Sequence, residues 1–72
     1  MKKVYCNRMR ELREDRDKMQ KEIAAVLGIL QQTYARYESG EREIPIRHLF
    51  ILAKYYKVST DYILGLVKRK EK

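Results

Sequence analysis

The fold of this chain is constrained most strongly by residues 20–39, where two short helical patterns meet at a glycine. Residues 20–27 (QKEIAAVL) are strong helix formers, and Gly28 follows where a left-handed residue would end a helix. Residues 31–39 (QQTYARYES) resume the helical period and end at Gly40. Two helices this short, joined by a sharp turn, are expected to pack at a steep angle. Small Ala24 would let the two helices approach closely, and the positions expected to seal the interior between them are Ile23, Leu27, Ile29, Tyr34 and Tyr37.

Helical periodicity extends over both flanks of this unit. Apolar residues recur at helical spacing within residues 4–17 and again within residues 46–56, where a proline precedes the first turn. Ser59 is a good N-cap for a last short helix over residues 61–64, which Gly65 closes. No strand-like alternation appears, so we predict an all-α fold of five helices around one core. The core positions expected from the flanks are Tyr5, Met9, Leu12, Ile46, Leu49, Phe50, Ala53, Tyr56 and Tyr62.

Size and charge limit the class of protein further. Seventy-two residues are expected to form one domain with little room for a deep active site. The net charge of +7 favours a polyanionic partner such as nucleic acid or anionic lipid, and charge alone does not choose between the two. The basic tail KRKEK (68–72) carries +3 of this charge, and +4 remains on residues 1–67, which we expect to form the domain.

Small Ala24, the turn glycine Gly28 and the apolar positions around them resemble the helix-turn-helix of the lambda-repressor-like (Cro and xenobiotic-response-element, XRE) family. The resemblance continues through SGEREIP and VSTDYILG and covers roughly residues 8–66. It implies a compact five-helix lambda-repressor-like domain with its helix-turn-helix at 20–39. In that fold the helix over 31–39 enters the DNA major groove, and the helix before it lies across the backbone.

The outward face of the helix over 31–39 has the chemistry for reading bases. Glutamine can make paired hydrogen bonds to adenine, arginine to guanine, and an alanine methyl can touch a thymine methyl. The predicted base-contacting residues are Gln31, Gln32, Ala35 and Arg36. The resemblance also implies that Gln20, at the start of the preceding helix, contacts phosphate.

A carboxylate at the C-terminal end of a helix, such as Glu38, needs a cation to offset the helix dipole. The resemblance implies that Arg13 supplies it in a structural salt bridge. Family members usually have Ser or Thr before each of the two helices, where this chain has Met19 and Leu30, and each lost cap costs about 1 kcal/mol. Leu30 is instead predicted to make a flanking DNA contact, and Lys18, where the family has a core leucine, to extend its ammonium outward.

Competing chemistries have little support in the sequence. Cys6 and His48 are the chain's single cysteine and single histidine, too few for a zinc site, and no phosphate-binding glycine loop or nucleophile pair is present. We therefore expect no metal, no cofactor and no enzymatic activity. Cys6 is interpreted as a small helix residue and His48 as an ordinary polar one. Without a possible internal disulfide, a secretory signal or an apolar run long enough for a membrane, we expect a cytoplasmic protein.

These features predict a sequence-specific double-stranded-DNA-binding transcriptional regulator, a repressor that occupies an operator. Pairing into a homodimer on a palindromic operator would use the fifth helix and the residues after it. One alternative is a protein-interaction or antitoxin-like regulatory module that uses the exposed Leu30 and the Leu66-Val67 end as an apolar contact. Another is a nonspecific architectural protein, whose affinity would depend on salt but not on sequence.

Overall fold

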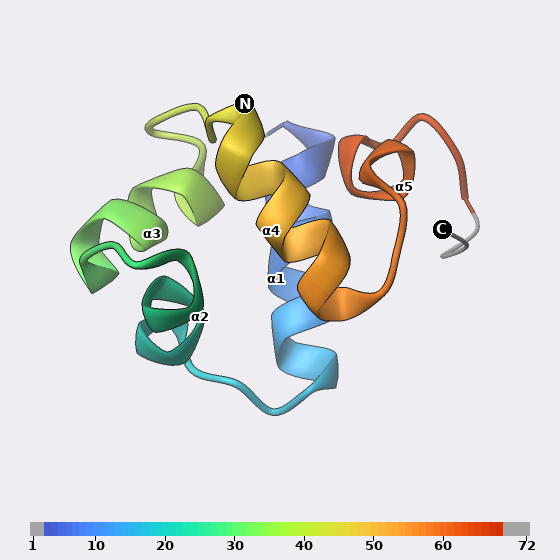
Figure 1. Ribbon diagram of the computed structural model, residues 1–72. Coiled ribbons are helices and arrows are strands. Elements are labelled where there is room, and N and C mark those ends of the chain that lie inside the picture. The colour runs from blue at the N-terminus through green and yellow to red at the C-terminus, as the bar shows by residue number, and fades with distance from the viewer. Residues whose placement is uncertain (1–2, 69–72) are drawn as a thin grey trace.

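The computed structural model describes residues 3–68, which contain five α-helices and no strand (Figure 1). The helices are α1 (Val4–Asp15), α2 (Gln20–Leu27), α3 (Gln31–Ser39), α4 (Ile46–Tyr56) and α5 (Thr60–Leu64). The predicted all-α fold is thus confirmed. Residues 69–72 of the predicted basic tail lie outside the described residues, so the boundary between domain and tail stays a prediction.

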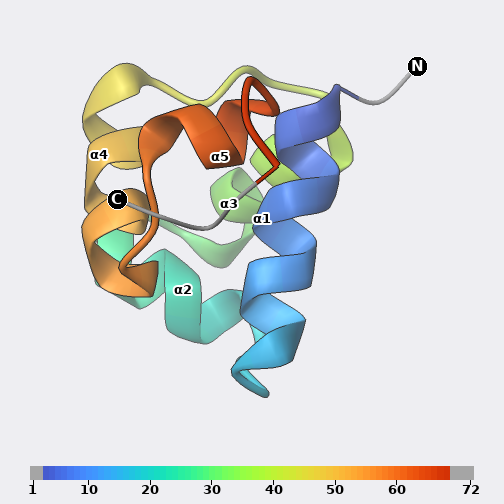
Figure 2. The same cartoon turned by 90° about the vertical axis from the view of Figure 1, so that its right-hand side faces the viewer.

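Helix α4 lies in the middle of the domain, with the α2 and α3 pair on one side and α5 on the other (Figure 1). It packs against both α2 and α5. Helix α1 contacts α3 and α5, so it closes the side of the domain behind α4 (Figure 2). The two helices of the predicted helix-turn-helix therefore rest on a frame made by α1 and α4.

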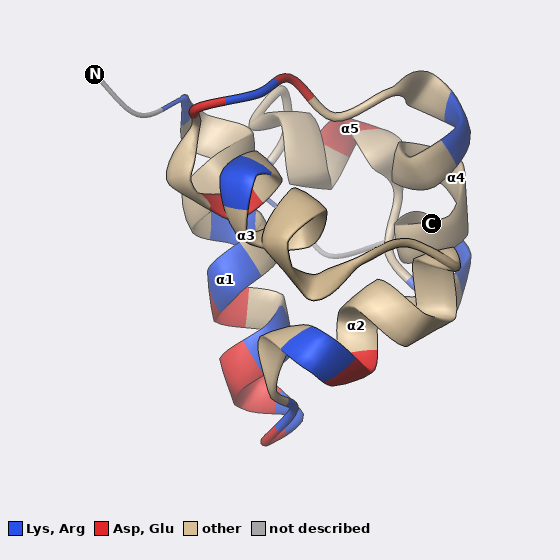
Figure 3. Cartoon of the chain, turned by 90° about the vertical axis from the view of Figure 1, so that its left-hand side faces the viewer, with Lys and Arg blue, Asp and Glu red and all other residues tan. Residues whose placement is uncertain are grey.

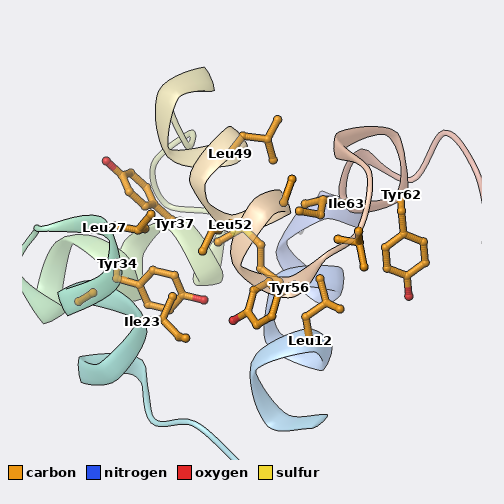
Figure 4. Close-up of a cluster of buried hydrophobic side chains, with 14 residues drawn as sticks. Leu12, Ile23, Leu27, Tyr34, Tyr37, Leu49, Leu52, Tyr56, Tyr62 and Ile63 are labelled. Atoms are coloured by element: carbon orange, nitrogen blue, oxygen red, sulfur yellow. The ribbon is translucent and has the colours of Figure 1, made fainter. Parts of the chain in front are cut away.

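One apolar cluster fills the space between the five helices (Figure 4). The tyrosines are part of it, as their spacing predicts, and Ile29 is half-buried against it. Burial of these side chains, at about 1.5–3 kcal/mol each, is the main force that holds such short helices together. The buried members are Met9, Leu12, Ile23, Ala24, Leu27, Tyr34, Tyr37, Leu49, Leu52, Ala53, Tyr56, Val58, Tyr62 and Ile63.

The apolar face predicted for α4 is wrong in two positions. Ile46 and Phe50 were expected in the core, but their exposed fractions are 68% and 57%. The helix buries Leu49, Ala53 and Tyr56, as predicted, together with His48 and Leu52. Apolar residues occur around most of α4, so the period alone does not fix its rotation. The rotation of α4 is fixed by its contacts with α2 on one side and α5 on the other.

The end of α1 departs from the prediction, and both α1 and α4 are followed by a left-handed residue that is not glycine. Helix α1 was predicted to run to residue 17 but ends at Asp15, because Asp17 takes a left-handed conformation (φ 55°). Lys57 does the same after α4 (φ 58°). In both turns the amide of the left-handed residue and the amide of the next residue donate back to helix carbonyls, as in a glycine-capped helix. Residues other than glycine are sterically disfavoured in this conformation.

Cys6, a small residue in α1 as predicted, and His48 are both buried. Cys6 is fully buried, and its thiol donates to the Tyr37 backbone carbonyl, 3.3 Å from the sulfur. His48 is 5% exposed, and its ring lies 5.9 Å from the Tyr37 ring. The Nδ1 atom of His48 has no hydrogen-bond partner among the described residues. The interpretation of His48 as an ordinary polar residue is therefore wrong.

Candidate nucleic-acid interface

The turn between α2 and α3 is built by the glycine that the sequence singles out. Gly28 is left-handed (φ 71°), its amide donates to the Ala25 carbonyl, and the Ile29 amide donates to the Ala24 carbonyl. These two hydrogen bonds cap the C-terminal end of α2, so the helix stops at Leu27. A Cβ added at Gly28 would meet nothing within 4 Å, so the turn needs glycine for its backbone and not for space. The turn fixes the angle at which α3 leaves α2.

The predicted base-contacting residues lie on the outer side of α3. Gln31, Gln32 and Arg36 are exposed, and Ala35 is half-buried. Gln32, Ala35 and Arg36 come together along a shallow hollow of about 330 Å³, which Ser39 and Glu41 also line. Gln31 stands in the first turn outside this hollow. Arg36 is 3.5 Å from the Glu41 carboxylate, a weak exposed ion pair that a base or phosphate could replace.

A second hollow, of about 220 Å³, adjoins the first and connects α3 with α1 and α2. Ala35 and Ser39 line both hollows. Gln20 also lines the second one, so the predicted phosphate-contacting residue lies beside the base-contacting set. The remaining lining residues are Arg10, Arg13 and Glu38.

Glu38 sits at the centre of a buried hydrogen-bond network behind this surface. Its side chain is 4% exposed and accepts from Arg13 through Nε at 2.8 Å and Nη2 at 3.0 Å. The Tyr34 hydroxyl donates to it at 2.7 Å, and the Gln20 amide at 3.1 Å. Arg13 also donates through Nη1 to the Lys18 carbonyl at 2.8 Å. The ion pair implied between Arg13 and Glu38 is thus present, and it ties α3 to both α1 and α2.

The network also sets the ionisation of its members. Burial alone would raise the pKa of Glu38, but hydrogen bonds from Arg13, Tyr34 and Gln20 outweigh it and hold this pKa below its usual value. Burial, together with the bond to Glu38, raises the pKa of the Tyr34 phenol. Glu38 is therefore ionised and Tyr34 neutral near neutral pH, the states in which every bond can form.

The two unusual cap positions are exposed. Neither Met19 nor Leu30 makes a side-chain cap, but the Glu22 carboxylate accepts from the Met19 amide at 2.8 Å, the half of a capping box that needs no hydroxyl. Leu30 is 72% exposed at the start of α3. Lys18 is half-buried with its ammonium 4.0 Å from the Glu22 carboxylate, which agrees with the outward extension predicted for it.

Charge on this side of the molecule is mixed (Figure 3). Basic and acidic residues alternate along α1, and the loop after α3 runs acidic, basic, acidic at residues 41–43. A uniform basic patch is therefore not what distinguishes the surface. Its distinguishing feature is the polar side of α3 on a firmly held helix.

Sequence reasoning missed two members of the network. Tyr34 was predicted as a core residue only, and the hydrogen bond from Gln20 to Glu38 was not predicted. A signal for Tyr34 existed, because residues 34 and 38 are four apart on one helix and such side chains meet. Nothing local indicates the bond from Gln20, which depends on the angle between α2 and α3. The predicted DNA contacts of Gln20 and Leu30 remain predictions.

The described residues form a helix-turn-helix domain. Its features are five short helices, a glycine turn between α2 and α3, and an exposed polar face on α3. Comparison with known protein families gives a match between residues 9–63 and the family Helix-turn-helix. The chain therefore belongs to this family. No helix in residues 3–68 is long and apolar enough to cross a membrane.

Several curated relatives are similar to this chain. It is 41% identical over 63 residues to the uncharacterized HTH-type transcriptional regulator YobD of Bacillus subtilis, a match that covers 88% of this chain and 56% of the relative. It is 37% identical over 68 residues to the HTH-type transcriptional regulator AnsR of Bacillus subtilis, covering 94% and 59%. It is 34% identical over 55 residues to the cryptic phage CTXphi transcriptional repressor RstR of Vibrio cholerae, covering 76% and 50%. The chain thus spans about half the length of the relatives it matches.

Proposed function

We propose that this chain is a sequence-specific double-stranded-DNA-binding transcriptional regulator that acts as a repressor. The observation that carries the proposal is the row of Gln32, Ala35 and Arg36 on the outer side of α3, a helix held in place by hydrogen bonds to α1 and α2. The relatives are named as transcriptional regulators, and one of them as a repressor, which supports the same function. Repression would follow from occupying an operator and blocking access to a promoter.

In this proposal α3 enters the major groove and its outer side chains read the base edges. Gln31 and Gln32 would bind adenine through paired hydrogen bonds, Arg36 would bind guanine, and the Ala35 methyl would touch a thymine methyl. Arg36 would give up its weak contact with Glu41 for the base, at little cost because that pair is exposed.

The start of each helix would meet the DNA beside the bases. The Gln20 side chain would contact phosphate, while the hydrogen bond that its amide donates to Glu38 keeps it aligned with α3. Leu30, with no hydroxyl to offer a phosphate, would pack against a thymine methyl or a sugar. Two copies would occupy the two halves of a palindromic operator, one helical turn apart.

Selection of bound duplexes from a random DNA library tests the proposal, because it reports specificity, site length and symmetry together. Gln32→Ala and Arg36→Ala should each weaken binding to the selected site by about 1–3 kcal/mol and leave binding to random DNA nearly unchanged. Ile51→Ala, on α4, is the control and should change neither affinity. Equal losses on selected and random duplexes would make these residues backbone contacts. A library without enrichment would reject sequence-specific binding.

A further inference from the structure

Glu41 lies beside the row of side chains that the proposed function uses, yet that function gives it no role. It lines the hollow of about 330 Å³ together with Gln32, Ala35 and Arg36, and it is the one acidic residue among the described residues that line it. Its side chain is 69% exposed. A carboxylate on a DNA-binding surface repels the phosphates. Glu41 should therefore weaken DNA binding unless its carboxylate finds a hydrogen-bond donor in the groove.

The backbone after α3 holds Glu41 against the last turn of that helix. Gly40 ends α3 in a left-handed conformation (φ 87°). The Ser39 hydroxyl donates to the Arg36 carbonyl at 3.2 Å and accepts from the Glu41 amide at 3.3 Å. The Arg42 amide also donates to the Arg36 carbonyl, at 3.1 Å. These bonds fold the chain back on α3, so Glu41 stays next to Arg36 whichever way the two side chains turn.

Arg36 and Glu41 present a hydrogen-bond donor and an acceptor side by side. The Nε atom of Arg36 lies 3.5 Å from a Glu41 carboxylate oxygen. In the major groove a G·C pair presents the complementary pattern, because guanine offers the acceptors N7 and O6 and cytosine offers its N4 amino donor next to them. An A·T pair has the acceptor O4 of thymine where cytosine has this amino group. The two side chains are thus complementary to a G·C pair and not to an A·T pair.

A contact with cytosine would replace the partner that Glu41 loses on DNA. In the proposed function Arg36 leaves Glu41 for guanine, which places an unpaired carboxylate in the groove. The amino group of the cytosine in the same pair lies beside the guanine O6 atom. A hydrogen bond from this amino group to Glu41 leaves neither charged side chain without a partner, and hydrogen bonds to charged groups are the stronger kind.

We propose that Glu41 is a specificity-determining residue, which accepts a hydrogen bond from the cytosine N4 amino group in the G·C pair whose guanine Arg36 reads. The inference rests on the proposed function, because it needs α3 in the major groove. Two side chains then read both bases of one pair. Replacing that pair by A·T sets the carboxylate against thymine O4, so Glu41 repels the wrong pair as well as attracting the right one.

Glu43 provides a matched control within the same loop (Figure 3). It carries the same charge two residues further on, and its side chain is 80% exposed. It pairs with Lys3, the residue before α1, and is not among the residues that line the hollow. Glu43→Ala should therefore tighten binding to all duplexes by a similar factor, because it removes a negative charge without removing a base contact.

A modified base tests the contact of Glu41 in the whole chain. The pair to modify is the one at which Arg36→Ala loses its preference for guanine. N4-methylcytosine has a methyl group in place of the amino hydrogen that faces the groove, and it still pairs with guanine. The wild-type chain should bind the modified duplex about tenfold more weakly than the unmodified one. Glu41→Ala should bind both duplexes equally, and Glu43→Ala should show the wild-type loss. An equal loss in the wild type and in Glu41→Ala would reject the contact.

The ratio of affinities for the selected site and for random DNA separates base reading from simple repulsion. Glu41→Ala should lower this ratio about tenfold, and it should bind random DNA at least as tightly as the wild type does. Circular dichroism should show the variant folded, since the side chain is exposed. If Glu41→Ala tightens binding to both kinds of DNA by one factor, as Glu43→Ala should, Glu41 acts only by repulsion and the proposal is wrong.

The remaining outcomes distinguish this inference from the proposed function. If the wild type binds the methylated and unmodified duplexes equally while Arg36→Ala loses its guanine preference, Glu41 does not read cytosine and the proposed function stands. If Glu41→Ala then also loses guanine preference, Glu41 only orients Arg36, which again rejects the contact. A library without enrichment rejects both proposals, because no base is then read.

Discussion

Removing the cation beside Glu38 should destabilise the domain more than any surface change. The carboxylate is 4% exposed, and Arg13 supplies two of its four hydrogen bonds. Breaking a buried ion pair from one side costs 3–5 kcal/mol. Arg13→Met should cost about 3 kcal/mol, the lower end, because Tyr34 and Gln20 still donate to the charge. That is a large share of the 5–15 kcal/mol typical of a domain.

Glu38→Leu should cost less, about 2 kcal/mol, because it leaves the Tyr34 hydroxyl without its buried acceptor, while Arg13, 13% exposed, keeps its hydrogen bond to the Lys18 carbonyl. The double variant has no buried charge and should also lose about 2 kcal/mol, well below the sum of the single losses. Urea unfolding followed by circular dichroism measures all three, with equal m-values required. Arg10→Met, an exposed change on the same helix, should stay within about 0.5 kcal/mol.

The same variants also test how the stability of the fold depends on pH. The pKa of Glu38 is lowered in the folded state, so its ion pair stabilises the fold above the ordinary carboxyl value near 4.5 and is lost as pH falls through the lower folded value. In Arg13→Met the pKa of Glu38 should rise, and protonation should then reduce the penalty of the substitution in acid. Additive single losses at neutral pH, or a penalty that does not shrink in acid, would refute the assigned coupling.

Three further outcomes follow from the helix ends and from His48. Gly28→Ala should lower the free energy of unfolding by about 1–2 kcal/mol through backbone strain alone. Gly65→Ala should lower it more, because the added Cβ would lie 2.5 Å from a Val4 methyl. Equal losses in urea unfolding would contradict this difference. Lys57→Gly should stabilise the domain by up to about 1 kcal/mol by relieving a left-handed side chain, and a lower Tm would count against it. Burial, helped by Arg47, lowers the pKa of His48, so stability should begin to fall as pH drops through about 6.5, and His48→Gln should flatten that part of the unfolding profile.

The sequence by itself determined where the helices lie, because those signals are local. Gly28 and Gly65 are left-handed at the predicted ends, and Ser59 caps α5 by accepting from the Tyr62 amide at 2.9 Å. Each of these features depends on the residue and its near neighbours along the chain, so one sequence is enough to predict it.

The candidate site was predictable in part, for the same reason. The exposed side of α3 follows from its helical period, and the position of Arg13 opposite Glu38 was carried by the family resemblance. Two further donors to Glu38 were not foreseen, because one of them, Gln20, reaches it only once α2 and α3 have packed at their final angle.

Only the tertiary structure decided which way each helix faces and which polar groups are enclosed. Helix α4 is apolar around much of its circumference, so its period permits several rotations, and contact with α2 and α5 selects the one that buries His48 and exposes Phe50. Lys57 is left-handed where the chain turns back and buries Val58, and Asp17 is left-handed where the chain turns from α1 toward α2. These outcomes minimise the free energy of the whole domain and have no counterpart in any short stretch of sequence.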